Sequence, residues 1–445
     1  MRKKDKTHVF ITGATGLMGG AALKELMKHP SEYEISVLAR DSKKNRKLMK
    51  GLRSKGVKVI WGDLLDSEAL MKGIKEADIV LHIGGMVSPA AEHYPSKTLE
   101  VNVGSAKKIA SIIRELEEKD KFRTIKTVYI GSVSQYGSHN VPDHWKRVGD
   151  KLGCAKFDAY SLSKILAERE IVMAGLRKWV SIRQTAILHS GLLKKANDPV
   201  TFHVPLNGTI EWVTVEDSGR LIERICRRDV PDDFWNNYYN VGGGETFRLT
   251  NIEFERQILK SMGCPPPEKV FEPNWFATEN FHGVWFSDSD NLDSILKFRD
   301  SGSFADSLQK MKEDLPFYFR FVPLVPAFVI KWFMKRVAKK KDLGPLSWIA
   351  ENNTDRIDAA WGGPENYKKI GRWENYQELN LNRKKEINKS EAKNRKISNL
   401  LKEKRCSHGH SYLSSEILEY GGHGCPECLR NESFVDKVIN QGCGQ

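Results

Sequence analysis

The sequence contains few cysteines and no recognisable export signal. Seven cysteines in 445 residues are too few and too scattered for a disulfide scaffold. Residues 1–8 are basic and lead directly into a strand-like segment, without the apolar stretch or small-residue cleavage site of a signal peptide. We therefore expect a protein of the reducing cytoplasm that carries no disulfide framework.

Long uninterrupted apolar runs are also missing. Residues 316–334 are the most apolar stretch, but three prolines together with Arg320 and Lys331 interrupt it, and a transmembrane helix needs about 20 clean residues. Two alternatives remain, a helix lying on a membrane with basic residues as its flank, or a helical cap packed on the main domain. We expect the cap; peripheral membrane contact by residues 316–341 stays open but is not favoured.

Positive charge is unevenly distributed along the chain. The formal charge is +14, and residues 383–405 hold ten lysines or arginines against three glutamates, so half of the excess lies in one short stretch. Such a stretch can neutralise phosphates, but aromatic residues for base stacking are sparse nearby. We predict a solvated linker or helix there, and nucleic acid is not an expected partner.

The rest of the chain alternates between buried-strand patterns and helical patterns. Apolar residues make up 40% and charged residues 29%, which permits a sizeable core. Strands alternating with helices predict an α/β fold with a doubly wound, parallel Rossmann-type sheet. The expected strands are 8–12, 35–39, 58–61, 79–83, 127–130 and 180–187, and helices are expected at 105–117 and 161–176.

The alternation weakens after about residue 190, where Gly, Pro, Asn and aromatic residues become frequent. This change predicts a smaller substrate lobe. The expected organisation is a domain over 1–300 (nucleotide-binding part about 1–190, substrate lobe about 190–300), an apolar helical cap or extension over 301–382, a basic linker over 383–405, a zinc module over 406–430 and a tail over 431–445.

The first expected strand runs into a glycine-rich turn, Gly13-Ala14-Thr15-Gly16-Leu17-Met18-Gly19, and then into a helix. Glycines let the backbone approach a pyrophosphate, and the helix N-terminus offers free N–H donors to it. The second strand ends at Arg40, where an NAD-preferring site would place a carboxylate for the ribose hydroxyl. An arginine there can bind a 2′-phosphate, so NADP is the preferred cofactor, with NAD as the alternative.

A tyrosine and a lysine four residues apart provide acid-base chemistry. Tyr160 and Lys164 share one face of a predicted helix. A nearby ammonium, together with an oxidised nicotinamide, favours the phenolate of Tyr160, which could then move a proton near neutral pH.

These motifs together resemble the extended short-chain dehydrogenases/reductases, the NAD-dependent epimerase/dehydratase family. TGATGLMG resembles the family's TGxxGxxG, Asp63-Leu64 lies where the family holds the adenine ring, and His82-Ile83-Gly84-Gly85 and Asn102-Val103-Gly104-Ser105 resemble its HxAA and NVxGT elements. The resemblance covers roughly 300 residues. It implies that Ser132 positions the substrate oxygen, that Tyr160 transfers the proton, that Lys164 tunes Tyr160 and holds the ribose, and that Asn102 supports a proton relay.

The reaction is less sharply defined than the family. Sugar-nucleotide 4,6-dehydratases of this family carry Thr-Asp-Glu where this chain has Ser132-Val133-Ser134, so dehydration is disfavoured. An oxidoreductase acting on a carbonyl or secondary alcohol of a small molecule is preferred. A sugar epimerase and a non-catalytic, dinucleotide-sensing scaffold are the alternatives, and a homodimer remains open. Six aromatics within 271–286 could line an apolar pocket or simply pack in the core, and His189 and His203 are candidate ligand contacts.

The C-terminus contains a cluster with metal-ligand spacing. Cys406, His410, Cys425 and Cys428 supply three thiolates and one imidazole, which suits tetrahedral zinc. The pattern resembles small zinc-ribbon or treble-clef modules. A segment of about 25 residues cannot bury a core of its own, so a structural zinc is the expected source of its order.

Overall fold

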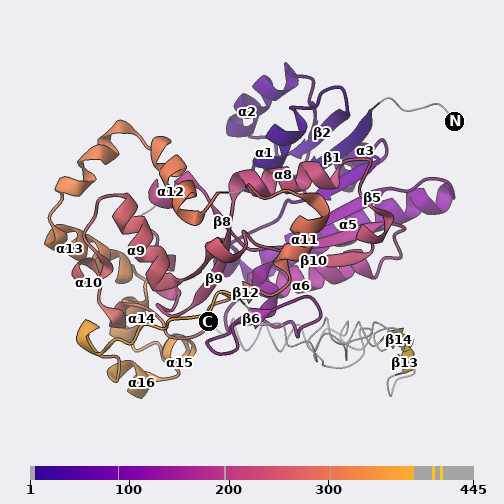
Figure 1. Cartoon of the computed structure of the whole chain (residues 1–445). Coiled ribbons are helices and arrows are strands. Elements are labelled where there is room, and N and C mark those ends of the chain that lie inside the picture. The colour runs from indigo at the N-terminus through magenta and orange to yellow at the C-terminus, as the bar shows by residue number, and fades with distance from the viewer. Residues whose placement is uncertain are drawn as a thin grey trace.

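The computed structural model describes residues 6–88, 90–194, 197–300, 302–384, 403–405 and 411–413. Two lobes lie side by side, one on a large parallel sheet and the other on a smaller sheet with the C-terminal helices (Figure 1).

Seven parallel strands form the large sheet, in the order β10-β7-β5-β4-β1-β2-β3. The order reverses between β1 and β4, and such a switch point opens a ligand crevice at the carboxyl ends of the strands. The expected α/β fold with a doubly wound Rossmann-type sheet is confirmed. The strands are β1 (Thr7–Thr12), β2 (Tyr33–Ala39), β3 (Lys58–Trp61), β4 (Ile79–His82), β5 (Lys126–Ser132), β7 (Trp179–Gln184) and β10 (Asn237–Val241).

Apolar residues on both faces of the strands bury the sheet between two helix layers. In β1, Val9 and Ile11 belong to one core cluster and Phe10 to the other, because successive side chains of a strand point to opposite faces. One layer contains α1 (Leu17–Leu26), α2 (Lys43–Arg53), α8 (Val215–Ile225) and α11 (Ser289–Leu296); the other contains α3 (Ser67–Ile74), α5 (Pro95–Lys119) and α6 (Ala159–Val172).

The smaller lobe begins where β7 gives way to a second sheet, ordered β11-β9-β8. Its strands are β8 (Ala186–Leu188), β9 (Thr209–Thr214) and β11 (Arg248–Thr250), and two short strands, β6 (Trp145–Lys146) and β12 (Trp285–Phe286), pair beside it. Helices surround this sheet: α7 (Ser190–Lys194), α9 (Asn251–Ser261), α10 (Pro267–Val270), α12 (Phe304–Glu313), α13 (Ala327–Ala338), α14 (Pro345–Ala350), α15 (Thr354–Trp361) and α16 (Pro364–Lys368).

Short elements complete the fold. They are α4 (Ala90–His93), the paired strands β13 (Glu403–Arg405) and β14 (Ser411–Leu413), and the 3-10 turns η1 (Val133–Tyr136), η2 (Pro199–His203), η3 (Asp232–Phe234), η4 (Glu245–Phe247), η5 (Pro273–Trp275), η6 (Phe317–Leu324) and η7 (Trp373–Asn375).

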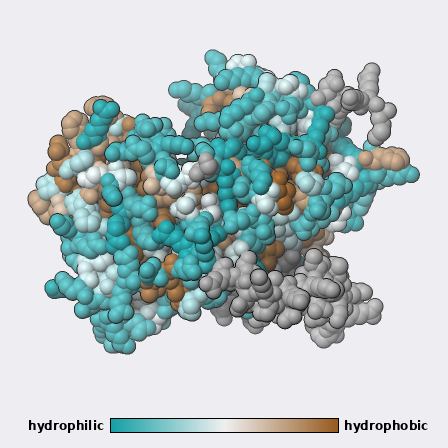
Figure 2. All heavy atoms as spheres, viewed as in Figure 1, coloured by the Kyte–Doolittle hydropathy of each residue, from teal (hydrophilic) through white to brown (hydrophobic). Residues whose placement is uncertain are grey.

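The aromatic cluster over 271–286 packs mainly in the core. Five of its six rings are buried, and the remaining one, Phe281, lines a cavity described below. By contrast, hydrophobic spheres gather on the left edge of the molecule in Figure 2, over the segment that Figure 1 draws in orange around η6 and α13.

A buried ion pair joins α6 to the sheet. Both carboxylate oxygens of Glu168 accept bonds from Arg183 of β7, at 2.8 and 3.1 Å, and the two side chains are at most 1% exposed. Arg183 also donates to the hydroxyl of Tyr136, which donates in turn to Asn240 of β10. A buried ion pair with this many bonds fixes the position of α6 against β5, β7 and β10.

Removing one charge of this pair should destabilise the protein strongly. Glu168→Gln leaves the guanidinium of Arg183 buried without its counter-charge, so we expect the free energy of unfolding to fall by about 3–5 kcal/mol. The matched control, Glu115→Gln, removes an exposed pair with Lys119 one helical turn away and should cost about 0.5 kcal/mol or less. Urea unfolding of both variants measures the difference, and equal losses would contradict the role assigned to Glu168.

Candidate active site

The glycine turn after β1 provides a backbone cradle. Gly13 has φ +78°, and a Cβ added there would lie 2.6 Å from the backbone nitrogen of Gly84. A Cβ at Gly16 would lie 3.3 Å from the carbonyl oxygen of Gly13. The backbone therefore excludes a side chain at Gly13 and leaves little room for one at Gly16, and the turn leads into α1 with the N–H donors of the first helical turn free for a pyrophosphate.

One cavity of about 980 Å³ extends from this cradle to the end of β5. Ligand pockets commonly measure about 300–1,000 Å³, so the cavity has room for a dinucleotide together with a substrate. Asn102 does not line it, whereas the residues predicted to bind the cofactor and the three predicted to act on the substrate all do: Gly13, Thr15, Gly16, Leu17, Met18, Gly19, Arg40, Asp63, Leu64, Gly84, Ser132, Tyr160 and Lys164.

Arg40 and Asp63 lie at the end of the cavity expected to hold the adenosine. Arg40 follows β2 and is exposed at the rim, and Lys43 and Lys44 lie on α2 outside the cavity lining. The Oδ1 atom of Asp63 accepts a bond from the backbone N–H of Leu65 at 3.1 Å, which fixes the loop after β3. The guanidinium of Arg40 therefore lies where NAD-selective sites place a carboxylate.

The three candidate catalytic side chains converge at the carboxyl end of β5. Ser132 ends that strand, and its hydroxyl lies near the side chain of Tyr160 in the first turn of α6, where it lowers the pKa of that phenol. Lys164 lies one turn further, with Nζ 5.9 Å from the centre of the Tyr160 ring. The ammonium of Lys164 donates to the carbonyl oxygen of Ile130 at 2.7 Å, which anchors α6 to β5 beside Ser132.

Burial favours the uncharged form of both titratable groups. It raises the pKa of Tyr160 to about 12, with the Ser132 hydrogen bond acting in the opposite direction. Burial lowers the pKa of Lys164 to about 8, and the charge of Glu168 offsets part of this effect. The protein alone therefore holds Tyr160 as a phenol, and the phenolate expected from the sequence requires the positive charge of a bound nicotinamide.

Asn102 and His82 hold the loop that follows β4. The carboxamide of Asn102 accepts from the N–H of Met86 at 2.7 Å and donates to the carbonyl of Met86 at 3.0 Å and to Ser163 at 2.8 Å. His82 contacts the hydroxyls of Thr12 and Ser105, and burial lowers its pKa to about 3, so it is neutral. Both side chains position the cavity wall.

A histidine–aspartate pair that the sequence did not point to also borders the cavity. Asp158 caps α6 by accepting from the N–H of Ser161 at 2.8 Å, and it also accepts from Nδ1 of His282 at 2.9 Å. Burial opposes protonation of His282, but the charge of Asp158 prevails and raises the pKa of the imidazole. The partners are 124 residues apart, so no local pattern could have revealed the pair.

A second cavity of about 640 Å³ shares Phe281 and His282 with the first. Trp348 and Arg356 line it, as does His203, whose Nε2 donates to the carbonyl of Leu343 at 2.7 Å. The other candidate histidine, His189, accepts from the N–H of Gly191 at 3.1 Å.

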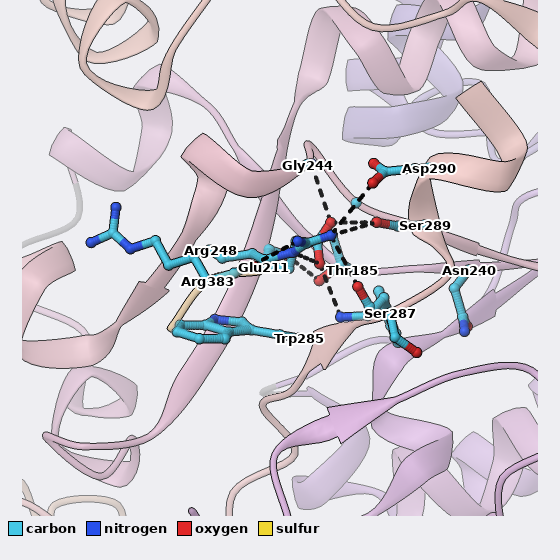
Figure 3. Close-up of polar contacts among 12 residues, drawn as sticks. Thr185, Glu211, Asn240, Gly244, Arg248, Trp285, Ser287, Ser289, Asp290 and Arg383 are labelled. Atoms are coloured by element: carbon cyan, nitrogen blue, oxygen red, sulfur yellow. Dashed lines mark hydrogen bonds and ion pairs between the residues drawn. The ribbon is translucent and has the colours of Figure 1, made fainter. Parts of the chain in front are cut away.

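A buried glutamate organises the wall where the two sheets meet (Figure 3). Glu211 of β9 accepts from Arg248 at 2.9 Å, from Ser289 at 2.6 Å and from the N–H of Phe286 at 2.9 Å. The hydroxyl of Thr185, a residue of the cavity lining, donates to the carbonyl oxygen of Glu211 at 2.5 Å. This network holds the substrate-side wall against β7.

The predicted zinc ligands Cys406, His410, Cys425 and Cys428 all lie outside the described residues. Within the described part of the chain, no group of three or more His, Cys, Asp or Glu side chains could hold a metal ion. The zinc module stays a prediction.

Fold and cavity define a dinucleotide-binding protein of the Rossmann type. Residues 9–182 match the model of the "NAD dependent epimerase/dehydratase family". The chain belongs to this family, as the motifs indicated.

Three similar proteins illustrate the match. An uncharacterized membrane protein of Methanocaldococcus jannaschii, MJ1061, is 31% identical over 55% of this chain and 67% of its own length. The UDP-glucose 4-epimerase of Mycoplasma genitalium is 25% identical over 39% of this chain and 52% of its own length. The dTDP-glucose 4,6-dehydratase of Bacillus anthracis, solved in complex with NAD, has the same fold, with a TM-score of 0.55, 17% identity and coverage of 69% of this chain and 96% of the other. The match to several other curated relatives covers only about a third or less of their own length.

The titration of Lys164 should be visible in the pH profile. We expect kcat/KM for any reaction in which Tyr160 gives up its proton to fall as the pH rises through about 8. Below this pH the ammonium is present and stabilises the phenolate left when Tyr160 gives up its proton; above it, that charge is lost. Lys164→Arg keeps a cation throughout and should remove the inflection whatever its absolute rate. An inflection that persists in this variant would assign the titration to another group.

Proposed function

We propose that this protein is an NAD(P)-dependent oxidoreductase that acts on a carbonyl or secondary alcohol. The observation that carries the proposal is that Ser132, Tyr160 and Lys164 line the same cavity as the glycine turn. A dinucleotide seated on the turn would supply or accept the hydride. Ser132 holds the substrate oxygen, Tyr160 gives that oxygen a proton or takes one from it, and Lys164 stabilises the phenolate that results.

The charges of the cavity support an anionic substrate of the nucleotide-sugar class. Arg40, Lys97, Lys164 and His282 line it, whereas Asp63 is its one carboxylate among the described lining residues. Lys97 and His282 are paired with carboxylates outside the lining, so Arg40 and Lys164 carry most of this argument. A mostly cationic wall favours phosphate-bearing ligands. The similarity to an enzyme of UDP-glucose and to one of dTDP-glucose supports a sugar carried on a nucleoside diphosphate.

Epimerisation is the second candidate. An epimerase keeps NAD bound and returns the hydride to the opposite face of the sugar, whereas a reductase exchanges its cofactor in every turnover. The similarity to a UDP-glucose 4-epimerase favours an epimerase. Arg40 at the rim favours a reductase, because it suits an exchangeable NADP. A scaffold that only senses the dinucleotide would make no use of the Tyr160 hydroxyl.

We propose NADP as the cofactor, with NAD as the alternative. We also propose a structural zinc ion bound by Cys406, His410, Cys425 and Cys428. Arg40 supports NADP through its place after β2. The NAD bound to the B. anthracis dehydratase supports the alternative.

Tyr160→Phe tests the chemistry. It removes the hydroxyl that moves the proton, so we expect turnover to fall by at least about a hundredfold while nucleotide binding is kept. Turnover is measured with a panel of UDP- and dTDP-sugars and their keto forms, with NADP or NADPH, and NMR of the sugar separates epimerisation from reduction. Tyr239→Phe is the control, because that hydroxyl bonds to the carbonyl of Phe234 outside the cavity. Unchanged turnover in Tyr160→Phe would reject Tyr160 as the group that moves the proton, and an absence of turnover by the unaltered protein across the panel would leave the sensing scaffold as the function.

Arg40→Ala tests the cofactor. Loss of a guanidinium that pairs with a 2′-phosphate should weaken NADP by about tenfold or more and leave NAD nearly unchanged. Calorimetric titration with each dinucleotide measures the split. Arg53→Ala is the matched control, since Arg53 is exposed at the far end of α2. Equal weakening of both dinucleotides would remove the argument for NADP.

A further inference from the structure

Large apolar side chains are concentrated on one exposed segment. Of the 17 large apolar residues exposed in the described part of the chain, eight fall between residues 317 and 333. Scattered apolar residues are normal on a protein surface, but a contiguous patch of aromatics marks an interaction site. The residues of this patch, here called the apolar face, are Phe317, Tyr318, Phe321, Leu324, Phe328, Val329, Trp332 and Phe333.

The opposite side of the elements that carry the apolar face is packed in the core. On α13, Met334, Val337 and Ala338 are buried in a core cluster with Phe202. Phe328 and Trp332 lie one helical turn apart on the outer side and are 73% and 59% exposed. One side of α13 therefore packs on the main domain, as expected. The other side is exposed.

The segment that carries the apolar face has charged residues of one sign. Residues 316–341 contain seven lysines and arginines and no acidic residue. Among them, Arg336 stacks on Trp332, with its guanidinium carbon 4.9 Å from the ring centre, and Lys331 pairs with Glu272. Lys339, Lys340 and Lys341 follow α13 directly and are exposed.

This pattern fits an anionic lipid surface better than a second copy of the chain. Interfacial segments carry Trp and Phe on one side and Lys or Arg beside them, because the rings enter the headgroup region while the cations meet anionic lipids. A pairing of two such faces would bring the cations of one copy against those of the other. No single described helix is long and apolar enough to cross a bilayer; η6 and α13 pass that test only as a pair, bent by 109°.

We propose that η6 and α13 dock the protein onto the surface of an anionic membrane without crossing it. Figure 2 shows this face at the edge of the molecule, where nothing from the described part of the lobe covers it. Lys340 also lines the second cavity. Docking would therefore place that cavity close to the lipid headgroups.

Flotation of the full chain with vesicles tests the proposal. We expect binding to vesicles of phosphatidylcholine and phosphatidylglycerol in a 7:3 ratio, and weaker binding to pure phosphatidylcholine or at high salt. The double variant Phe328→Ser, Trp332→Ser should bind about tenfold more weakly for each ring removed. Phe122→Ser is the matched control because Phe122 is 82% exposed and lies after α5 on the other lobe. Circular dichroism and thermal melting verify that each variant folds.

Three outcomes would overturn the proposal. One is vesicle binding that survives the double variant unchanged, since binding would then come from other cations of the chain. Another is an absence of vesicle binding by the unaltered protein. The third is a dimer in analytical ultracentrifugation that the double variant dissociates while vesicle binding is absent, because the apolar face would then join two copies.

Discussion

The ion pair between Glu168 and Arg183 is the constraint from which the geometry of the site follows. Two buried charges are costly to desolvate, and they persist only when nearly all of their bonds are made. Here Glu168 satisfies Arg183 through both oxygens, and Arg183 reaches the hydroxyl of Tyr136. Helix α6 can therefore take only one position against β5 and β7, and Tyr160 and Lys164, which precede Glu168 on that helix, have their places fixed beside Ser132.

A second buried carboxylate does the same for the other wall of the cavity. Glu211 collects donors from Arg248, Ser289 and two backbone N–H groups. Its own carbonyl accepts from Thr185, one residue beyond β7. The two networks meet along β7. Buried charges whose hydrogen bonds are all made tolerate little displacement, so these networks set the distance between the nucleotide-binding half and the substrate-side half.

The features that the sequence predicted are those that depend on short spacing. The glycine turn after Thr12 and the Tyr160–Lys164 pair are local, so their geometry follows from a strand, a turn or one helical period. Glu211 and the Asp158–His282 pair join segments far apart in the chain, and no periodicity marks them. The exposure of Phe328 and Trp332 matches the alternative that the sequence left open and did not favour, since an apolar run predicts burial equally well on one side of a helix or on both. Likewise, the aromatics of residues 271–286 gave no local sign that Phe281 alone reaches the cavity.

The bonds around Ser132 and Asp158 bear on which reaction the cavity supports. Dehydration in the manner of related 4,6-dehydratases needs an acid and a base directly after Ser132, where this chain has Val133 and Ser134. The hydroxyl of Ser134 donates to that of Ser132 at 3.0 Å and so serves to orient it. Among nearby carboxylates, Asp158 is engaged by Ser161 and His282, and these bonds keep its pKa low although burial alone would raise it. It is therefore a poor base. Tyr160 lines the cavity with Ser132, and its phenol is the proton-transfer group of the proposed reaction. A single phenol paired with a lysine suits hydride exchange at one carbon, which needs one proton moved on one oxygen.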